Sequence, residues 1–137
     1  NTFSYNSSYW TNKKNYSLDD GLEGLTDKET KLSSYWNTPF NKICLGMKVN
    51  NYSTNWTVID HQASSLFKLI KDNNFTSTSV GIKAWESLVV HHSSWEENQM
   101  RGYQEGFNLY NEYVCTRIGF YLRIKCPGSS IGPFLGL

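Results

Sequence analysis

Apolar and polar residues alternate strictly along two stretches of the chain, residues 42–49 and 115–125. A period of two is typical of β-strands that place one face on a core and the other toward solvent. Each stretch carries a cysteine on its polar face, Cys44 in the first and Cys115 in the second. The two stretches together predict a sheet that spans most of the chain.

Between these stretches the pattern changes to that of helices. Residues 55–60 predict a second strand, joined to the first by a polar turn as a hairpin. A helix is predicted next, with Asp60 as its cap, because four apolar residues then fall on one helical face. Those residues are Ala63, Leu66, Phe67 and Ile70.

A second helix is predicted over residues 80–90, with Ile82, Trp85 and Val89 on one face. Residues 94–97 have the form of a capping box, which predicts a short helical turn before Gly102. Residues 105–110 predict a further strand. The elements together predict an α+β fold, a mainly antiparallel sheet with two or three short helices packed on one face.

The two ends of the chain show no regular period. Residues 1–28 predict an extended arm and a loop rich in aromatic and polar residues, and residues 32–40 predict extended chain. The core is expected over residues 29–126 of a single domain that spans 1–137, with an irregular tail at 127–137.

The composition and charge of the chain argue against several classes of function. The 137 residues include 13 basic and 12 acidic ones, a net charge of +1, which gives no electrostatic case for nucleic acid or an anionic membrane. No apolar run is long enough to span a bilayer. The three histidines and three cysteines show no metal-ligand spacing, so neither metal nor cofactor is expected.

Five asparagines stand in the acceptor pattern for N-glycosylation, where about 2.7 are expected by chance. With the Ser-, Thr- and Asn-rich composition, this favours a secreted, extracellular glycoprotein. A polar loop composition that happens to contain the pattern is the alternative. The acceptors are Asn6, Asn15, Asn51, Asn55 and Asn74, of which Asn51 and Asn74 are the predicted glycan carriers.

The odd number of cysteines predicts one bridge and one remaining thiol. Cys44 and Cys115 share the polar faces of their strands and Cys126 has the opposite parity, so a Cys44–Cys115 bridge is predicted if the strands are neighbours. Cys126 beside an apolar tail is consistent with a homo-oligomer contact through that tail. A buried free thiol with a frayed tail is the equal alternative.

No arrangement of residues indicates catalysis. Glu96, Glu97 and Glu105 could suggest a glycosidase pair, but the first two are explained by the capping box. Cys44 lies in a strand with nothing nearby to activate its thiol, and His91 and His92 point in different directions on a helix. A non-enzymatic protein is therefore predicted.

Several strings resemble a small secreted domain of cnidarian extracellular proteins, including coral skeletal organic matrix proteins. The resemblance covers residues 29–120, and implies an extracellular protein without assigned catalytic residues. The chain departs from the family by lacking a cysteine just before residue 105. The matching strings are ETKLSSYW, TPFNKICLGMKV, SSLFKLIKDNNFTSTSVGIKAWESLV, EGFN and TRIGF.

The segment 94–108 mixes aromatic rings with amide and charged groups, as sugar sites do. We therefore expect a lectin-like recognition or defence protein, antiviral defence included, that binds a glycan or glycoprotein. The alternative function is that of a structural component of an extracellular or skeletal matrix. The alternative for the segment is that Trp95 only packs at the start of a helix and binds no ligand. The candidate binding residues are Trp95, Asn98, Arg101, Tyr103, Gln104 and Asn108.

Overall fold

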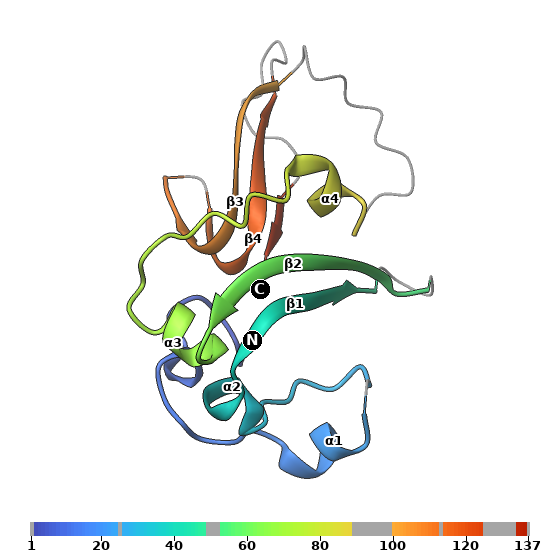
Figure 1. Cartoon of the computed structure of the whole chain (residues 1–137), viewed down its shortest axis with the longest axis vertical. Helices are drawn as coiled ribbons and strands as arrows, with labels where there is room; N and C mark the ends of the chain where they lie inside the picture. Colours follow the sequence, from blue (N-terminus) through green and yellow to red (C-terminus); the bar gives the residue numbers. More distant parts are fainter. Residues whose placement is uncertain are drawn as a thin grey trace.

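The computed structural model describes residues 2–24, 26–48, 53–88, 100–112, 114–124 and 134–136. Its fold is α+β, and every strand pair is antiparallel. The prediction of a single sheet is wrong, because the described strands form two sheets, β1-β2 and β3-β4-β5. In Figure 1 the β1–β2 hairpin crosses the middle of the molecule, with the β3–β4 hairpin above it and α1 and α2 below.

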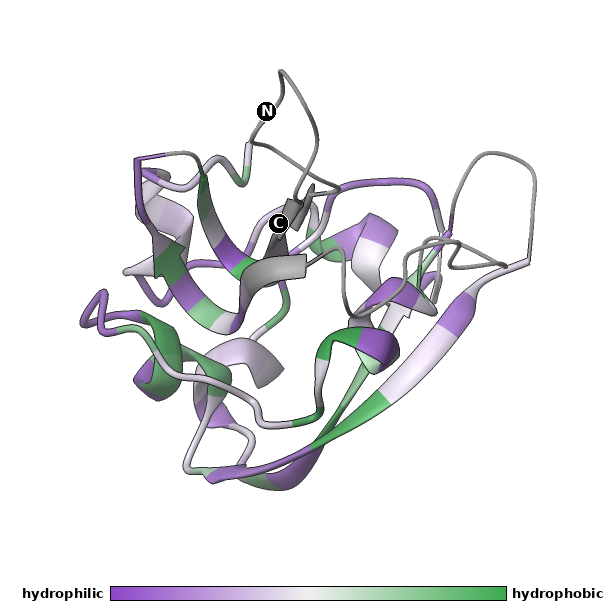
Figure 2. Cartoon of the chain, turned by 90° about the horizontal axis from the view of Figure 1, so that it is seen from above, coloured by the Kyte–Doolittle hydropathy of each residue, from purple (hydrophilic) through white to green (hydrophobic). Residues whose placement is uncertain are grey.

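The first sheet is the predicted hairpin. β1 (Phe40–Met47) pairs with β2 (Asn55–Ala63) from Lys42↔Asp60 to Met47↔Asn55, and the register shifts between Phe40 and Lys42. The predicted alternation holds along β1, where Leu45 is buried and Cys44 is exposed. In Figure 2, hydrophilic and hydrophobic positions follow one another along the strands rather than forming one apolar run.

The second sheet contains the late strand predicted from the sequence. β3 (Met100–Tyr110) and β4 (Cys115–Ile124) form a long hairpin, and β5 (Phe134–Gly136) adds to β4. The tail expected to be irregular thus contributes a short strand. The prediction of a polar, solvent-facing side for β4 is wrong. Arg117 and Tyr121, on the predicted polar side, are buried, as is Phe120 on the apolar side.

The described residues form four α-helices rather than two or three: α1 (Leu18–Leu22), α2 (Ser34–Asn37), α3 (Leu66–Ile70) and α4 (Ile82–Glu86). Asp60 lies within β2 and does not cap α3. Ser65 caps it instead, since the Ser65 hydroxyl accepts from the Lys68 backbone N–H at 3.1 Å. None of these helices is long and apolar enough to cross a bilayer.

The first residues are not an extended arm. A 3-10 turn, η1 (Ser8–Trp10), places the Trp10 indole in the core, and its Nε1 donates to the Ser4 carbonyl at 2.9 Å. Backbone hydrogen bonds join Tyr16 to Lys31, which fixes this segment against the chain that follows. Residues 34–37, expected to be extended, form α2.

One buried cluster connects the two sheets, two helices and the first residues. It explains why the sheets need not be hydrogen-bonded to each other, since their apolar faces meet through shared side chains. Its members are Trp10, Leu45, Ile59, Ile70, Ile82, Trp85, Leu88, Phe107, Ile118 and Phe120.

Candidate functional site

Of the six residues predicted to bind a ligand, the structure describes the side chains of three, and two of these are exposed. Tyr103 and Gln104 are exposed on β3, and 47% of the Tyr103 surface is accessible. Asn108 is buried, so its placement in a binding surface is wrong. Arg101 lies on β3 with its side chain outside the description, and Trp95 and Asn98 lie outside the described residues, as does the predicted capping box.

Asn108 has a structural task that explains its burial. Its backbone has a φ of 54°, a left-handed conformation that asparagine tolerates better than most residues. The side-chain Nδ2 donates to the carbonyls of Ile70 and Asn74, both at 3.1 Å. Asn108 therefore ties β3 to the end of α3 and to the loop that follows.

Arg117 lies opposite Asn108, between the pairs Phe107↔Ile118 and Leu109↔Thr116 of the β3–β4 ladder. Its Nη1 donates to Asn108 Oδ1 at 2.9 Å, and its Nε donates to the Tyr5 carbonyl at 2.8 Å. The guanidinium also lies 4.2 Å from the centre of the Tyr5 ring. Arg117 thus connects β4 to the first residues of the chain.

A second buried polar group, Glu105, joins β3 to the loop before α4. Its Oε1 accepts from Ser77 Oγ at 2.7 Å and from the Ser79 backbone N–H at 3.0 Å. Its Oε2 accepts from Trp85 Nε1 at 2.7 Å and from both the backbone N–H and the hydroxyl of Thr78. This carboxylate therefore holds the loop and α4 in place.

Burial tends to raise the pKa of the Glu105 carboxyl, but hydrogen bonds from Thr78, Ser77, Trp85 and Ser79 outweigh it and the pKa lies below its usual range. Both carboxylate oxygens are occupied by these donors. Glu105 consequently positions the loop and α4, because both oxygens of its carboxylate accept hydrogen bonds from them.

The loop held by Glu105 and the strand β3 enclose a surface hollow of about 380 Å³. Two aromatic side chains contribute to it, Phe75 from the loop and Tyr103 from β3, and each is about half exposed, at 48% and 47%. The other lining residues are Ser77, Ser79, Gly81, Gln104 and Glu105. The hollow thus combines two aromatic rings with hydroxyl and amide groups.

The backbone places Phe75 beside β3. Thr76 and Phe107 exchange two hydrogen bonds, 3.0 Å from Thr76 N to Phe107 O and 2.8 Å from Phe107 N to Thr76 O. A Cβ on Gly106 would stand 2.0 Å from the Thr76 carbonyl oxygen. Glycine is therefore needed at 106 for the loop to approach the strand this closely.

Phe75 was missed by sequence reasoning because it lies in a polar loop with no period. The one local signal is a single phenylalanine within the run DNNFTSTS, residues 72–79. A large apolar residue among turn-forming residues either packs on the domain or contacts a ligand, and the sequence does not distinguish the two.

The predicted Cys44–Cys115 bridge is not formed. Both thiols are free and exposed, and the premise of neighbouring strands fails, since Cys44 lies on β1 of one sheet and Cys115 on β4 of the other. Cys126 lies outside the described residues. The described His, Cys, Asp and Glu side chains include no group placed to hold a metal ion.

The predicted glycan acceptors differ in exposure. Asn6, Asn15 and Asn74 are exposed outside the strands, whereas Asn55 begins β2, is partly buried and donates to the Leu88 carbonyl at 3.4 Å. Asn51 lies outside the described residues.

Comparison with known proteins assigns neither a family nor a fold relative. No family model matches the chain, and no curated protein or solved structure matches it significantly.

Proposed function

We propose that this protein is a secreted, non-enzymatic recognition protein that binds a glycan in the hollow between Phe75 and Tyr103. The observation that carries the proposal is the pair of half-exposed rings, which reach one hollow from two separate segments. Exposed aromatic rings suit the apolar face of a pyranose, and neighbouring polar groups suit its hydroxyls.

The polar groups of the hollow support the proposal, because they suit the hydroxyls of such a ligand. The Gln104 Oε1 accepts from Asn111 Nδ2 at 3.2 Å, which orients the Gln104 amide so that its nitrogen can donate to a sugar hydroxyl. The Ser77 hydroxyl donates to Glu105 and accepts from the Ser79 backbone N–H at 3.3 Å, which leaves one lone pair for a ligand donor. Because Glu105 fixes the loop, these groups lose little freedom on binding, which favours affinity.

A location outside the cell is part of the same proposal. The acceptor sites at Asn6, Asn15 and Asn74 are exposed, as glycosylation requires, and the resemblance to cnidarian extracellular proteins supports secretion. We expect protein purified from its native source to carry glycan at Asn74 and Asn51, measurable as excess intact mass. An unmodified mass would contradict that expectation.

The test of the site is a glycan-array screen of the whole chain, followed by titration of the strongest ligand against Phe75→Ala and Tyr103→Ala. Each substitution removes a ring face on which a sugar could stack. Such stacking contributes on the order of 1 kcal/mol to the free energy of binding, so affinity should fall about fivefold or more. Both residues are about half exposed, so unfolding stability should change little.

Trp56→Ala is the matched control. The Trp56 ring is 49% exposed, close to the values of Phe75 and Tyr103, but it lies on β2 of the other sheet. Its removal should leave glycan affinity unchanged. The proposal fails if no array glycan binds saturably, which is what the matrix-component hypothesis predicts, or if Trp56→Ala weakens binding as much as the two hollow variants do.

A further inference from the structure

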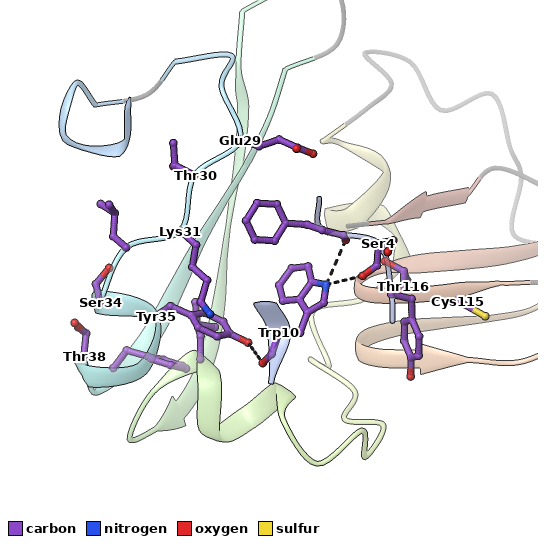
Figure 3. A pocket seen from close by; sticks show the side chains of 15 residues that line it. Ser4, Trp10, Glu29, Thr30, Lys31, Ser34, Tyr35, Thr38, Cys115 and Thr116 are labelled. Atoms are coloured by element: carbon purple, nitrogen blue, oxygen red, sulfur yellow. Dashed lines mark hydrogen bonds between the residues drawn. The ribbon is translucent and has the colours of Figure 1, made fainter. Parts of the chain in front are cut away.

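A second and larger cavity lies away from the glycan hollow, between the first residues of the chain, the segment around α2, and the start of β4. Its volume is about 960 Å³, at the upper end of the range of about 300–1,000 Å³ typical of small-molecule sites. Figure 3 shows side chains from these three regions converging on it. Its main apolar lining consists of Phe3, Tyr5, Trp10, Leu32, Tyr35 and Phe40.

The polar atoms of the Tyr35 and Trp10 side chains are already used inside the protein. The Tyr35 hydroxyl donates to the Trp10 carbonyl at 2.8 Å, and burial raises the pKa of this phenol, so it stays protonated. The Trp10 Nε1 donates to the carbonyls of Phe3 and Ser4. These dashed contacts in Figure 3 leave the ring surfaces, rather than their polar ends, to a ligand.

Two charged side chains are present among the described residues that line the cavity, and only one of them is open to a ligand. The Lys31 ammonium donates to the Tyr9 carbonyl and to both the carbonyl and Oδ1 of Asn12, which uses its three donors. Burial also lowers the pKa of Lys31. The exposed Glu29 carboxylate makes no ion pair or hydrogen bond with any described residue.

We propose that this cavity binds an amphiphilic ligand that has an apolar body and a cationic amine or quaternary ammonium group. The cations of the protein already lie over two of the lining rings, Lys31 over Tyr35 at 4.9 Å and Arg117 over Tyr5 at 4.2 Å. The other three aromatic rings would cover the apolar body and contact the ligand cation through their faces, and Glu29 would supply the opposite charge at the rim. Those three rings are Phe3, Trp10 and Phe40. A carboxylic acid of the same size would meet the Glu29 charge and find the Lys31 donors occupied.

The experiment compares three probes with the same ten-carbon chain, decyltrimethylammonium, decanol and decanoate. Each is titrated calorimetrically, the two ionic probes below their micelle concentrations and decanol below its solubility limit. Decyltrimethylammonium should bind about tenfold more tightly than decanoate, with decanol between them. Glu29→Gln should weaken the cationic probe about three- to fivefold and leave decanol unchanged. Glu23→Gln, which removes the same charge outside the cavity lining, is the control and should change neither.

The location is checked with the two free cysteines. Cys115 lines the cavity and Cys44 does not, although both are exposed, so bound probe should slow alkylation of Cys115 by iodoacetamide and spare Cys44. The proposal is overturned if decanoate binds as tightly as the cation, if no probe binds, if Glu23→Gln and Glu29→Gln act alike, or if both cysteines are protected equally.

Discussion

Arg117 carries a buried positive charge whose described partners are all neutral. It donates to a backbone carbonyl of Tyr5 and to the side-chain oxygens of Asn73 and Asn108, and it covers the Tyr5 ring. Its fork of donors reaches these acceptors from one rigid plane, which a lysine ammonium does not match. The arginine geometry, rather than its charge alone, is therefore what holds the first residues to β4.

We expect Arg117→Lys to lower the free energy of unfolding by about 2–3 kcal/mol, because acceptors paired with the guanidinium would be left buried and unpaired. Urea unfolding followed by fluorescence measures the change. Lys42→Met is the control, since Lys42 makes an exposed pair with Asp60 at 3.1 Å and its loss should cost under about 1 kcal/mol. Equal losses in the two variants would show that Arg117 has no such role.

At the scale of elements, the approach of the loop containing Thr76 to β3 sets the width of the glycan hollow. Gly106, with a φ of 136°, is the position that permits it, since an added Cβ would overlap the Thr76 carbonyl oxygen. Glu105 beside it fastens the same loop through Ser77, Thr78 and Ser79. The hollow therefore depends on two adjacent residues of one strand.

Gly106→Ala should lower unfolding stability by at least about 3 kcal/mol, because a strained φ is combined with a backbone overlap. Gly24→Ala separates the two effects, since Gly24 has a φ of 98° and nothing within 4 Å of an added Cβ. That variant should lose about 1 kcal/mol. Thermal unfolding of both variants tests this, and similar losses would mean that the contact with Thr76 carries no weight.

The elements that could be predicted are those whose pattern is local. The β1–β2 hairpin follows from alternation in β1 and a polar turn, and the α3 face follows from Leu66, Phe67 and Ile70. The second buried face of β4 could not be predicted, because Arg117 is an ordinary polar residue in the sequence. It is buried only because Tyr5, Asn73 and Asn108 meet it from distant segments.

The part of the candidate site on β3 can be predicted from the local sequence, whereas the part contributed by the loop cannot. Tyr103 and Gln104 stand in a stretch whose mixture of rings and amides indicates a surface for a ligand. Asn108 shares that composition, yet its left-handed backbone turns its amide toward α3. Phe75 joins the site through a β-bridge between Thr76 and Phe107, a long-range pairing that no local pattern reports.

At the scale of the whole molecule, Glu105 links the fold to pH. The pKa of its carboxyl in the folded protein lies below the ordinary value of 4.5. A depressed pKa means that the ionised group stabilises the fold fully above pH 4.5 and that this contribution is lost as the pH falls through the folded pKa. Acid should therefore release the loop and α4 from β3.

We expect the free energy of unfolding to decline as the pH is lowered from about 5 to about 3, and Glu105→Gln to flatten part of that decline while lowering stability at neutral pH. Urea titrations across this range measure both effects. Glu112→Gln, which changes an exposed carboxyl in the β3–β4 turn, should keep the wild-type slope. A slope that Glu105→Gln leaves unaltered would contradict the assignment.

The glycan hollow and the aromatic cavity share no lining residue. The lining of the hollow comes from residues 75–81 and 103–105. The lining of the cavity comes from residues 3–10, 29–40, 66 and 115–116. A ligand of one site should therefore leave the backbone of the other largely unperturbed. This separation makes a residue-resolved binding measurement decisive for the recognition function.

The most direct measurement is a nitrogen-15 chemical-shift titration of the whole chain with the strongest glycan from the array. The account predicts saturable shifts that are largest at the amides of Phe75, Ser77, Ser79, Tyr103 and Gln104, with little change at Trp56 and along β1. Shifts centred on any other surface, or none at concentrations that saturate the array signal, would contradict glycan recognition at this hollow.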